Sequence, residues 1–215
     1  MSLWTPNRTL TKTDHQHLMD EAERVGVRNN RFLAQSVVEF GPGHSTFAFI
    51  EAGVPEIVGL EHDPEWFDAQ KDRFKDYEQV KIDWYYNEAP IAGVPAWVSS
   101  RSFDMAFVDS PKGYAGARVA HPGQEDCSRL NTCLAALKLA PTVLLHDAIR
   151  PLERGTLSRL EMLGHKVEWI DHPLKWKQFD QSYGLARIIR DGKIQKRSHL
   201  SGAVQSGRTP ARASG

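Results

Sequence analysis

The residues with the clearest chemical potential surround a glycine turn, Glu39-Phe40-Gly41-Pro42-Gly43-His44-Ser45. A largely apolar run over 36–40 leads into this turn, and we expect a helix after it. Glycines let the backbone turn sharply and approach a ligand closely. The dinucleotide-binding pattern needs a third glycine, but Thr46 stands there, which argues against a pyrophosphate site. A carboxylate ahead of the turn repels phosphate and suits an ammonium group.

A second acidic residue, Glu61, ends the next predicted strand, about 20 positions after the turn. In nucleotide-binding α/β proteins an acidic residue at this distance accepts hydrogen bonds from ribose hydroxyls. The structural alternative is a solvated charge at a strand end. Together, Glu39 and Glu61 favour an adenosine cofactor that carries an ammonium group and no phosphate. S-adenosylmethionine has these properties, and NAD does not.

Two further strand ends carry side chains that could activate a hydroxyl group. Asp109 precedes Ser110-Pro111-Lys112, and His146-Asp147 closes the following strand. Ligands of open α/β sheets bind in the crevice at the carboxyl ends of the strands. A positioned His, Asp or Lys can take the proton of a hydroxyl, an effect worth a factor of about 10²–10⁴ in rate. The predicted catalytic residues are Asp109, Lys112, His146 and Asp147.

The same edge of the sheet allows other interpretations of these residues. Asp109 and Asp147 could bind Mg²⁺, which prefers oxygen ligands and acidifies a bound hydroxyl. A structural role is the alternative for each side chain: His146 could hold a loop, Asp147 could cap the helix that follows, and Lys112 could be a solvated loop lysine.

Alternating strands and helices must position these residues. Repeated βα units imply parallel strands with right-handed crossovers. The last two strands have no clear helix between them, so we expect an antiparallel pair there. The predicted fold class is α/β, a Rossmann-like doubly wound seven-stranded sheet, mostly parallel with an antiparallel C-terminal strand. The predicted strands are 36–40, 56–61, 80–86, 102–109, 142–147, 167–170 and 184–189, and the predicted helices between them are 45–52, 63–74, 125–139 and 151–163.

Composition excludes several other classes of protein. Among 215 residues, Lys+Arg and Asp+Glu are equal at 27 each, so binding to nucleic acid by overall charge is not indicated. No apolar run approaches the roughly 20 residues that span a bilayer, and the N-terminus does not resemble a signal peptide. Cys127 and Cys133 have neither zinc-site spacing nor a disulfide pattern. We therefore expect a cytoplasmic protein without a membrane partner, and the sequence does not indicate its oligomeric state.

The sequence resembles the class I S-adenosylmethionine-dependent methyltransferases over about residues 36–190. The resemblance rests on the Glu-x-Gly-x-Gly turn, the acidic end of the second strand and the order of strands. It implies that Glu39 and the turn hold the methionine part of the cofactor, that Glu61 holds the ribose, and that Asn87 or Glu88 borders the adenine. The candidate cofactor-binding residues are Glu39, Gly41, Pro42, Gly43, His44, Ser45, Glu61, His62, Asn87, Glu88 and Asp109.

Four short motifs are similar to those of the plant glucuronoxylan 4-O-methyltransferases, which methylate a sugar hydroxyl. In that group Ala and Arg usually stand at the positions of Ser110 and Lys112, so the third motif departs from the pattern. The similarity favours an O-methyltransferase that acts on a carbohydrate or a small metabolite. The four motifs are Gly-His-Ser at 43–45, Leu-Glu-His-Asp-Pro-Glu-Trp at 60–66, Asp-Ser-Pro-Lys-Gly-Tyr at 109–114 and His-Asp-Ala-Ile-Arg-Pro-Leu-Glu at 146–153.

Three other functions stay open at this stage. They are a methyltransferase for an amine or a nucleic-acid base, an NAD-dependent oxidoreductase, and a non-catalytic module that keeps the fold. A base methyltransferase typically has an Asn/Asp-Pro-Pro-aromatic segment after its fourth strand. Asp109-Ser110-Pro111-Lys112 stands there instead, which makes nucleic acid an unlikely partner.

The expected organisation is an N-terminal helical extension over 1–35, a methyltransferase domain over 36–190 and a flexible tail over 191–215. The extension has helical spacing from about Thr11 to Arg28. His15 and His17 lie in this helix but do not share a face. We therefore interpret them as solvated side chains and not as a pair of metal ligands.

Overall fold

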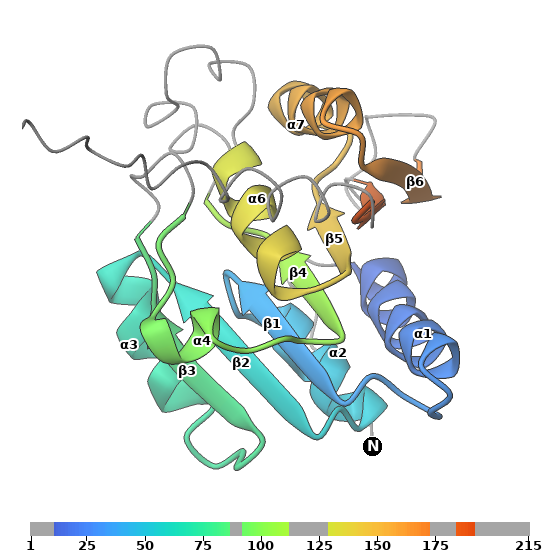
Figure 1. Ribbon diagram of the computed structural model, residues 1–215. Helices are drawn as coiled ribbons and strands as arrows, with labels where there is room; N and C mark the ends of the chain where they lie inside the picture. Colours follow the sequence, from blue (N-terminus) through green and yellow to red (C-terminus); the bar gives the residue numbers. More distant parts are fainter. Residues whose placement is uncertain (1–10, 87–91, 112–128, 173–183, 192–215) are drawn as a thin grey trace, which may run out of the picture.

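The computed structural model describes residues 11–86, 92–111, 129–172 and 184–191 (Figure 1). Strands and helices alternate along most of the chain, as the sequence predicts. The strands are β1 (Ser36–Phe40), β2 (Glu56–Glu61), β3 (Val80–Trp84), β4 (Met105–Val108), β5 (Thr142–His146), β6 (Lys166–Asp171) and β7 (Leu185–Ile189). The helices are α1 (Lys12–Arg28), α2 (His44–Ala52), α3 (Pro64–Arg73), α4 (Ala96–Ser99), α6 (Leu130–Leu139) and α7 (Pro151–Met162).

The observed boundaries differ from the predicted ones in places where local patterns are weak. β3 and β4 are shorter than expected because their outer residues leave the sheet hydrogen-bonding ladder. α4 was not predicted, since 4 residues are too few to show a helical period. α3 begins as expected, with Pro64 at its first position and the Asp63 carboxylate accepting from the N–H groups of Glu65 and Trp66.

The sheet has the order β3-β2-β1-β4-β5-β7-β6. β1 pairs in parallel with β2 and β4, and β4 pairs in parallel with β5. β7 lies antiparallel between β5 and β6, which confirms the predicted fold class. A sheet of this order differs from the 3-2-1-4-5-6 order of dinucleotide-binding domains.

The register of the parallel strands brings the predicted site residues to one level. Phe40 pairs with Leu60 on one side and with Val108 on the other. The residues that follow, Gly41, Glu61 and Asp109, therefore lie at the same edge of the sheet. Val108 also pairs with Leu145, which places His146 beside Asp109.

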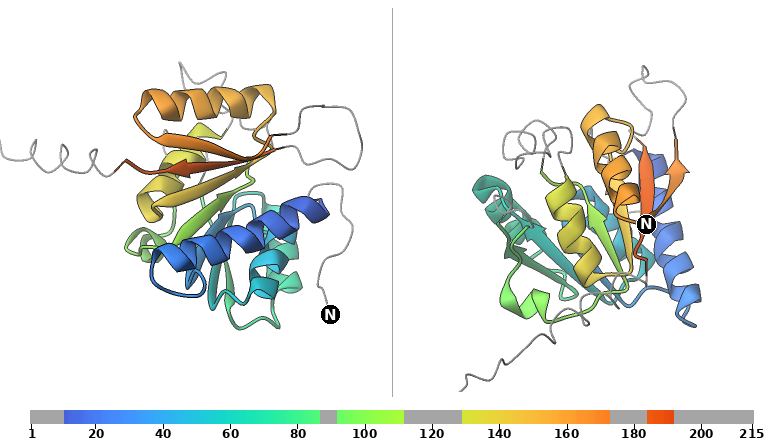
Figure 2. Two further views of the ribbon diagram at one scale, coloured as in Figure 1. Left: turned by 90° about the vertical axis from the view of Figure 1, so that its right-hand side faces the viewer. Right: turned by 45° about the horizontal axis from the view of Figure 1, so that its top comes forward.

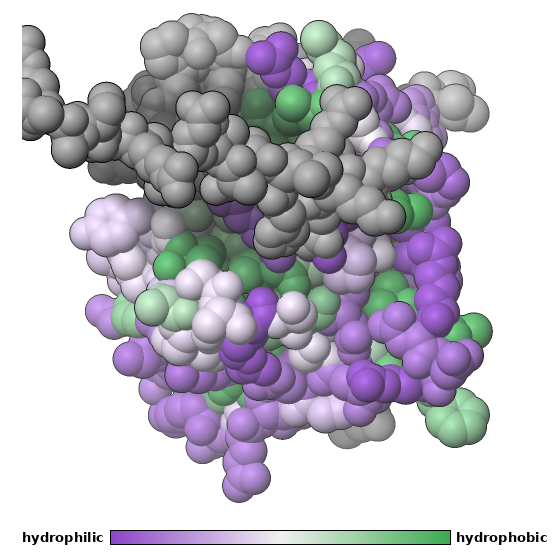
Figure 3. Space-filling model, in the orientation of Figure 1, coloured by the Kyte–Doolittle hydropathy of each residue, from purple (hydrophilic) through white to green (hydrophobic). Residues whose placement is uncertain are grey.

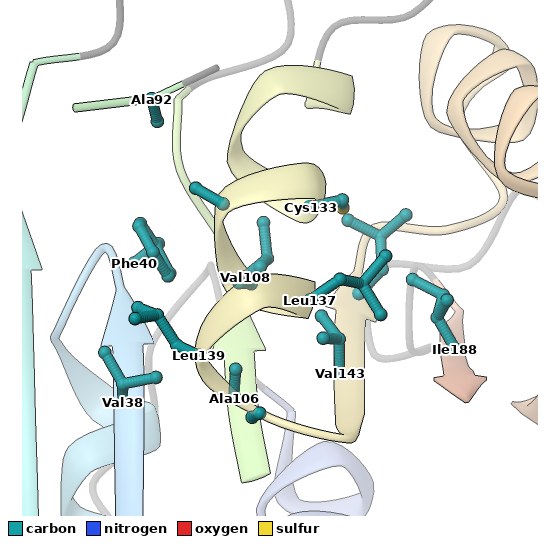
Figure 4. Close-up of a cluster of buried hydrophobic side chains, with 14 of the residues drawn as sticks. Val38, Phe40, Ala92, Ala106, Val108, Cys133, Leu137, Leu139, Val143 and Ile188 are labelled. Carbon is teal, nitrogen blue, oxygen red and sulfur yellow. The ribbon is translucent and has the colours of Figure 1, made fainter. Parts of the chain in front are cut away.

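Apolar side chains bury both faces of the sheet. Val38 and Phe40 of β1 belong to a cluster with residues of α4, α6 and α7, whereas Val37 belongs to a second cluster with α1 and α2. Figure 4 shows strand residues of the first cluster facing Leu137 of α6. Because side chains alternate along a strand, Glu39 points to the face that α1 and α2 cover.

Helix α1 is packed into the second cluster. Leu18, Ala22 and Val25 are buried there together with Phe49 of α2, and Figure 2 shows the helix lying along the sheet. Glu21 adds a polar contact, because Arg187 Nε of β7 donates to its Oε2 at 2.8 Å. The extension over 1–35 stays a prediction as a domain boundary, but its helix shares a core with the sheet.

The interpretation of His15 as a solvated side chain was wrong. Its side chain is buried, and its Nε2 lies 3.2 Å from Oε2 of Glu51 on α2. The reason is that His15 lies 3 residues before Leu18 and 7 before Ala22, on the same side of the helix, so it continues the apolar face that packs against α2. His17 is half-buried rather than fully solvated.

The distribution of hydrophilic residues on the surface agrees with the packing of α1 against the core. In Figure 3 the side of the molecule that carries α1 is mainly hydrophilic, and hydrophobic residues gather nearer the middle of the view. Over the ranges that the structure describes, we find no helix that is long and apolar enough to span a membrane.

Candidate active site

The turn between β1 and α2 depends on Gly41. Gly41 has φ of +88°, and its N–H donates to the carbonyl of Leu60 at 2.9 Å. A Cβ at Gly41 would lie 2.8 Å from Cβ of Ser110, so a side chain there would strain the backbone and collide with the end of β4. At Gly43, in contrast, a Cβ would meet no described atom within 4 Å. The turn therefore leaves open space beside its backbone.

Glu39 is fully buried below this turn. Neither of its carboxylate oxygens has a hydrogen-bond partner of good geometry within the described residues. Burial raises the pKa of Glu39 to about 7, Ser45 and Thr46 lower it in part, and the negative charge of Asp109 raises it further. Glu39 is thus a buried acid that a nearby cation would stabilise in its charged form.

The negative charge of Glu61 is compensated by backbone hydrogen bonds. Its Oε1 accepts hydrogen bonds from the backbone N–H groups of His62 at 2.8 Å and Asp63 at 3.0 Å. These bonds fix a largely buried carboxylate at the carboxyl end of β2, next to the glycine turn. An oriented carboxylate in this place is suited to accept hydrogen bonds from a pair of hydroxyl groups.

A hydrogen-bonded chain connects the ends of β2, β3 and β4. Tyr85 donates its hydroxyl proton to Ser110 Oγ at 2.9 Å, and Ser110 Oγ lies 2.9 Å from Nδ1 of His62. Burial raises the pKa of Tyr85, so its hydroxyl stays a donor. This hydrogen-bonded chain was not predicted for Tyr85 and Ser110, because the three residues are far apart in sequence.

Asp109 and His146 form the next contact along the edge. Nδ1 of His146 lies 3.0 Å from Oδ1 of Asp109. The Asp109 side chain is 26% exposed and the His146 side chain only 1%, so Asp109 reaches outward with His146 behind it. On its other side, His146 Nε2 lies 3.6 Å from Oδ2 of Asp14 at the start of α1.

The neighbouring charges decide the protonation of His146 and Asp109. Burial lowers the pKa of His146, but Asp109 and Asp147 outweigh it and hold that pKa well above its usual value. Burial raises the pKa of Asp109, but His146 and Arg129 outweigh it and lower that pKa. At neutral pH the pair is therefore an imidazolium and a carboxylate, and the carboxylate of Asp109 is the proton acceptor.

Arg129 holds this part of the site together and was not among the predicted site residues. Its side chain is 2% exposed. The guanidinium donates to the carbonyls of Pro111 at 3.0 Å and His146 at 2.9 Å, and to Oδ2 of Asp147 at 3.1 Å. It also lies 3.2 Å from Oδ1 of Asp109 and 3.6 Å from Oε1 of Glu153. A lone arginine before an apolar helix was the only hint in the sequence.

Asp147 supports Arg129 rather than capping α7. Its Oδ2 accepts from Arg129 and lies 2.7 Å from Nη1 of Arg150. The N-cap of α7 is Arg150, which makes no side-chain cap bond. Asp147 also has φ of +58°, a conformation that Asp tolerates better than most residues.

The residues fit Mg²⁺ poorly. Ligand atoms of Asp109, His146 and Asp147 lie within 4.8 Å of one another. However, Arg129 contacts both carboxylates, so their charge is already compensated. The third group is an imidazole, whereas Mg²⁺ prefers oxygen ligands. We therefore derive no step of the chemistry through a metal ion at this position.

Three predicted site residues cannot be placed in this geometry. Asn87, Glu88 and Lys112 lie outside the described residues. Their roles beside the adenine and at the acceptor stay predictions. Pro42, His44 and Ser45 lie in or directly after the turn, and burial, Arg73 and His15 lower the pKa of His44.

Comparisons with known proteins identify the fold and not the acceptor. No protein-family model matches the sequence, and the search of curated proteins finds no match either. Many solved structures are similar, and three of them show the range of chemistry named for this fold. A putative caffeoyl-CoA O-methyltransferase from Staphylococcus aureus is 14% identical, with a TM-score of 0.52 over 80% of this chain and 82% of that one.

The second is a precorrin-6y C5,15-methyltransferase from Geobacter metallireducens, 15% identical, with a TM-score of 0.52 over 86% of this chain and 91% of that one. The third is the N-methyltransferase NodS from Bradyrhizobium japonicum, 12% identical, with a TM-score of 0.55 over 83% and 94%. The chain thus has the fold of class I methyltransferases. The similarity to glucuronoxylan methyltransferases rests on the short motifs alone.

We predict that Arg129→Met lowers the free energy of unfolding by about 3–5 kcal/mol, because it leaves buried carboxylates without their cation. Arg129→Lys keeps the charge without the planar fork and should cost less. Urea denaturation measures both. The control is Arg101→Met, which breaks a partly exposed pair with Glu56 and should cost about 1 kcal/mol or less. Equal losses for Arg129→Met and Arg101→Met would contradict the role of Arg129.

Proposed function

We propose that the protein is an S-adenosylmethionine-dependent methyltransferase whose cofactor binds along the β1–α2 turn and the end of β2. The observation that carries this proposal is Glu39: a fully buried carboxylate without a cation beside a turn that leaves space at Gly43. An ammonium group in that space would supply the missing charge. A phosphate would add a second negative charge to a site that already holds one.

Two further observations support this cofactor over a dinucleotide. Thr46 replaces the third glycine, and its Oγ1 accepts from the N–H of Gly43 at 3.0 Å, which occupies a donor that a pyrophosphate would use. The sheet order also differs from that of dinucleotide-binding domains. In this proposal Glu61 holds the ribose, and Asn87 or Glu88 borders the adenine.

Methyl transfer needs a nucleophile opposite the cofactor. When bound, the cofactor supplies a methyl group activated by a sulfonium. Asp109 is the residue suited to orient an acceptor hydroxyl, because His146 and Arg129 both contact its Oδ1 while its side chain is part-exposed. The Asp109 carboxylate would accept the proton of the acceptor hydroxyl. Asp147 acts indirectly by holding Arg129, and Lys112 stays a predicted contact to the acceptor.

We favour a hydroxyl of a carbohydrate or small metabolite as the acceptor. The solved structures of the same fold include enzymes named for O-, N- and C-methylation, so the fold does not choose between acceptors. The choice rests on the motif resemblance and on Asp109-Ser110-Pro111-Lys112, which differs from the segment that base methyltransferases carry.

Calorimetry with S-adenosylhomocysteine tests the cofactor directly. Wild-type protein should bind it and should not bind NAD at the same concentration. Glu61→Gln should weaken binding at least tenfold, because the hydrogen bonds of a charged group to the ribose are worth about 1.5–3 kcal/mol. The matched control is Glu65→Gln in the exposed first turn of α3, which should leave the affinity unchanged. Binding of NAD alone would overturn the proposal.

The pH dependence of binding tests Glu39. With a pKa of about 7, Glu39 is mostly protonated below pH 7 in the free protein. An ammonium ligand favours the charged form, so binding releases a proton there and the affinity rises with pH up to about 7 and then levels. The rise should approach tenfold per pH unit. Glu39→Gln should flatten the profile between pH 5.5 and 7 in calorimetry; an unchanged profile would rule out contact with the ammonium.

Turnover tests Asp109. Asp109→Asn should lower kcat by about 10²–10⁴ with a smaller change in the affinity for S-adenosylhomocysteine, since the variant loses the proton acceptor and the charge that pairs with His146 and Arg129. Release of S-adenosylhomocysteine with a panel of sugars and small hydroxylated acceptors measures the rate. Asp171→Asn, at the end of β6, serves as a control that should keep its turnover. Full activity of Asp109→Asn would remove Asp109 from the reaction.

A further inference from the structure

A glycine in the middle of β2 lies against the turn that carries the candidate cofactor site. Gly59 is buried and pairs with Glu39 of β1 and with Ile82 of β3. Its φ lies outside the left-handed region, so the backbone conformation does not require glycine there. Glycine weakens the interior of a strand because it has no side chain to pack, and it often marks a close approach of another backbone segment. A contact above the strand, rather than the strand itself, should explain this residue.

The space above Gly59 is filled by the ring of Pro42. A Cβ at Gly59 would lie 2.8 Å from Cβ and 2.9 Å from Cγ of Pro42, and 2.6 Å from Cδ1 of Ile82. Non-bonded carbon atoms are most stable at about 3.5–4.0 Å, so all three contacts would be collisions. Cδ1 of Ile82 is the far end of a flexible side chain and can move away. The ring of Pro42 includes its own backbone nitrogen, so it can move only together with the turn.

Hydrogen bonds fix the turn on both sides of Pro42. The N–H of Gly41 donates to the carbonyl of Leu60 at 2.9 Å, and the N–H of Gly43 donates to Oγ1 of Thr46 at 3.0 Å. Pro42 itself is buried between these two anchored residues. A displacement of its ring would therefore strain both hydrogen bonds and change the open space beside Gly43.

We propose that Gly59 is a positioning residue for the cofactor: because it has no side chain, the ring of Pro42 can sit on β2, and this contact sets the place of the glycine turn. The inference rests on the proposed binding of S-adenosylmethionine along that turn. Gly59 acts through Pro42 and not by contact with the cofactor. It also pairs in register with Glu39, so the contact lies beside the carboxylate on which cofactor binding is proposed to depend.

Gly59→Ala in the full chain tests this role. The variant should bind S-adenosylhomocysteine at least about tenfold more weakly in calorimetry, because the added methyl group displaces the turn. The control is Gly53→Ala at the other end of α2. Gly53 has φ of +85°, and a Cβ there would come no closer than 3.9 Å to Cδ2 of Leu33. This control should lower the Tm through backbone strain and keep the affinity. An unchanged affinity of Gly59→Ala would contradict the proposal.

A second substitution separates the two collisions. Ile82→Val removes Cδ1, so Gly59→Ala combined with Ile82→Val keeps only the collision with Pro42. This double variant is less overpacked and serves also where Gly59→Ala alone does not fold. It should still bind S-adenosylhomocysteine at least about tenfold more weakly than Ile82→Val alone. Full recovery of the affinity would assign the effect to the packing of Ile82 and refute the role of Pro42.

A double-mutant cycle with Pro42→Gly tests the contact itself. Pro42→Gly removes the ring, so Gly59→Ala should change the affinity little further in that background. Equal losses with and without the ring would mean that Gly59 does not act through Pro42.

Amide hydrogen exchange of the ligand-free protein gives a measurement that does not depend on the proposed function. In Gly59→Ala the N–H of Gly41 should exchange at least about tenfold faster, because its bond to Leu60 opens more often. The N–H of Ile57, which donates to the carbonyl of Gln79 at the start of the same strand, should keep its rate. Wild-type protein that does not bind S-adenosylhomocysteine would refute the proposed cofactor. A Gly41 amide that keeps its protection in Gly59→Ala would refute the role of Gly59, whatever the ligand.

Discussion

Negative charge buried at one edge of the sheet is the constraint on which the site depends. Parallel pairing of β1, β2, β4 and β5 brings Glu39, Glu61, Asp109 and Asp147 to this edge. Burying a carboxylate is costly unless it is paired, hydrogen-bonded or protonated. The four are compensated in three ways: Glu61 by backbone N–H groups, Asp109 and Asp147 by Arg129, and Glu39 by a raised pKa. Of these residues, Glu39 is the one whose charged form a cationic ligand could stabilise.

These differences divide the edge of the sheet into two chemically distinct parts. The part near β1 and β2 has open space and a carboxylate without a cation, which suits a bound ligand. The part near β4 and β5 has an internal network around Arg129, which suits a rigid support for one part-exposed carboxylate, that of Asp109. In this arrangement His146 is a charge partner that keeps the pKa of Asp109 low, since an imidazolium flanked by carboxylates holds its proton.

Helix α1 belongs to this architecture in two respects. Its apolar face completes the core on one side of the sheet, and its first turn brings Asp14 to within 3.6 Å of His146. A helix that was expected as an extension therefore reaches the site. His15 continues the apolar stripe of this helix and is therefore buried where α1 packs against Glu51 of α2.

The sequence by itself determined the parts that depend on local pattern. Alternating βα units predicted the sheet, and the order of acidic strand ends predicted that Glu39, Glu61, Asp109 and His146 would meet at one edge, because parallel strands end together. Only the tertiary structure decided the partners. Arg129 with Asp147, Tyr85 with Ser110, and Asp14 with His146 are joined across distant segments, and no periodicity encodes which buried groups will face each other. Those contacts depend on long-range packing, which also sets the protonation of each group.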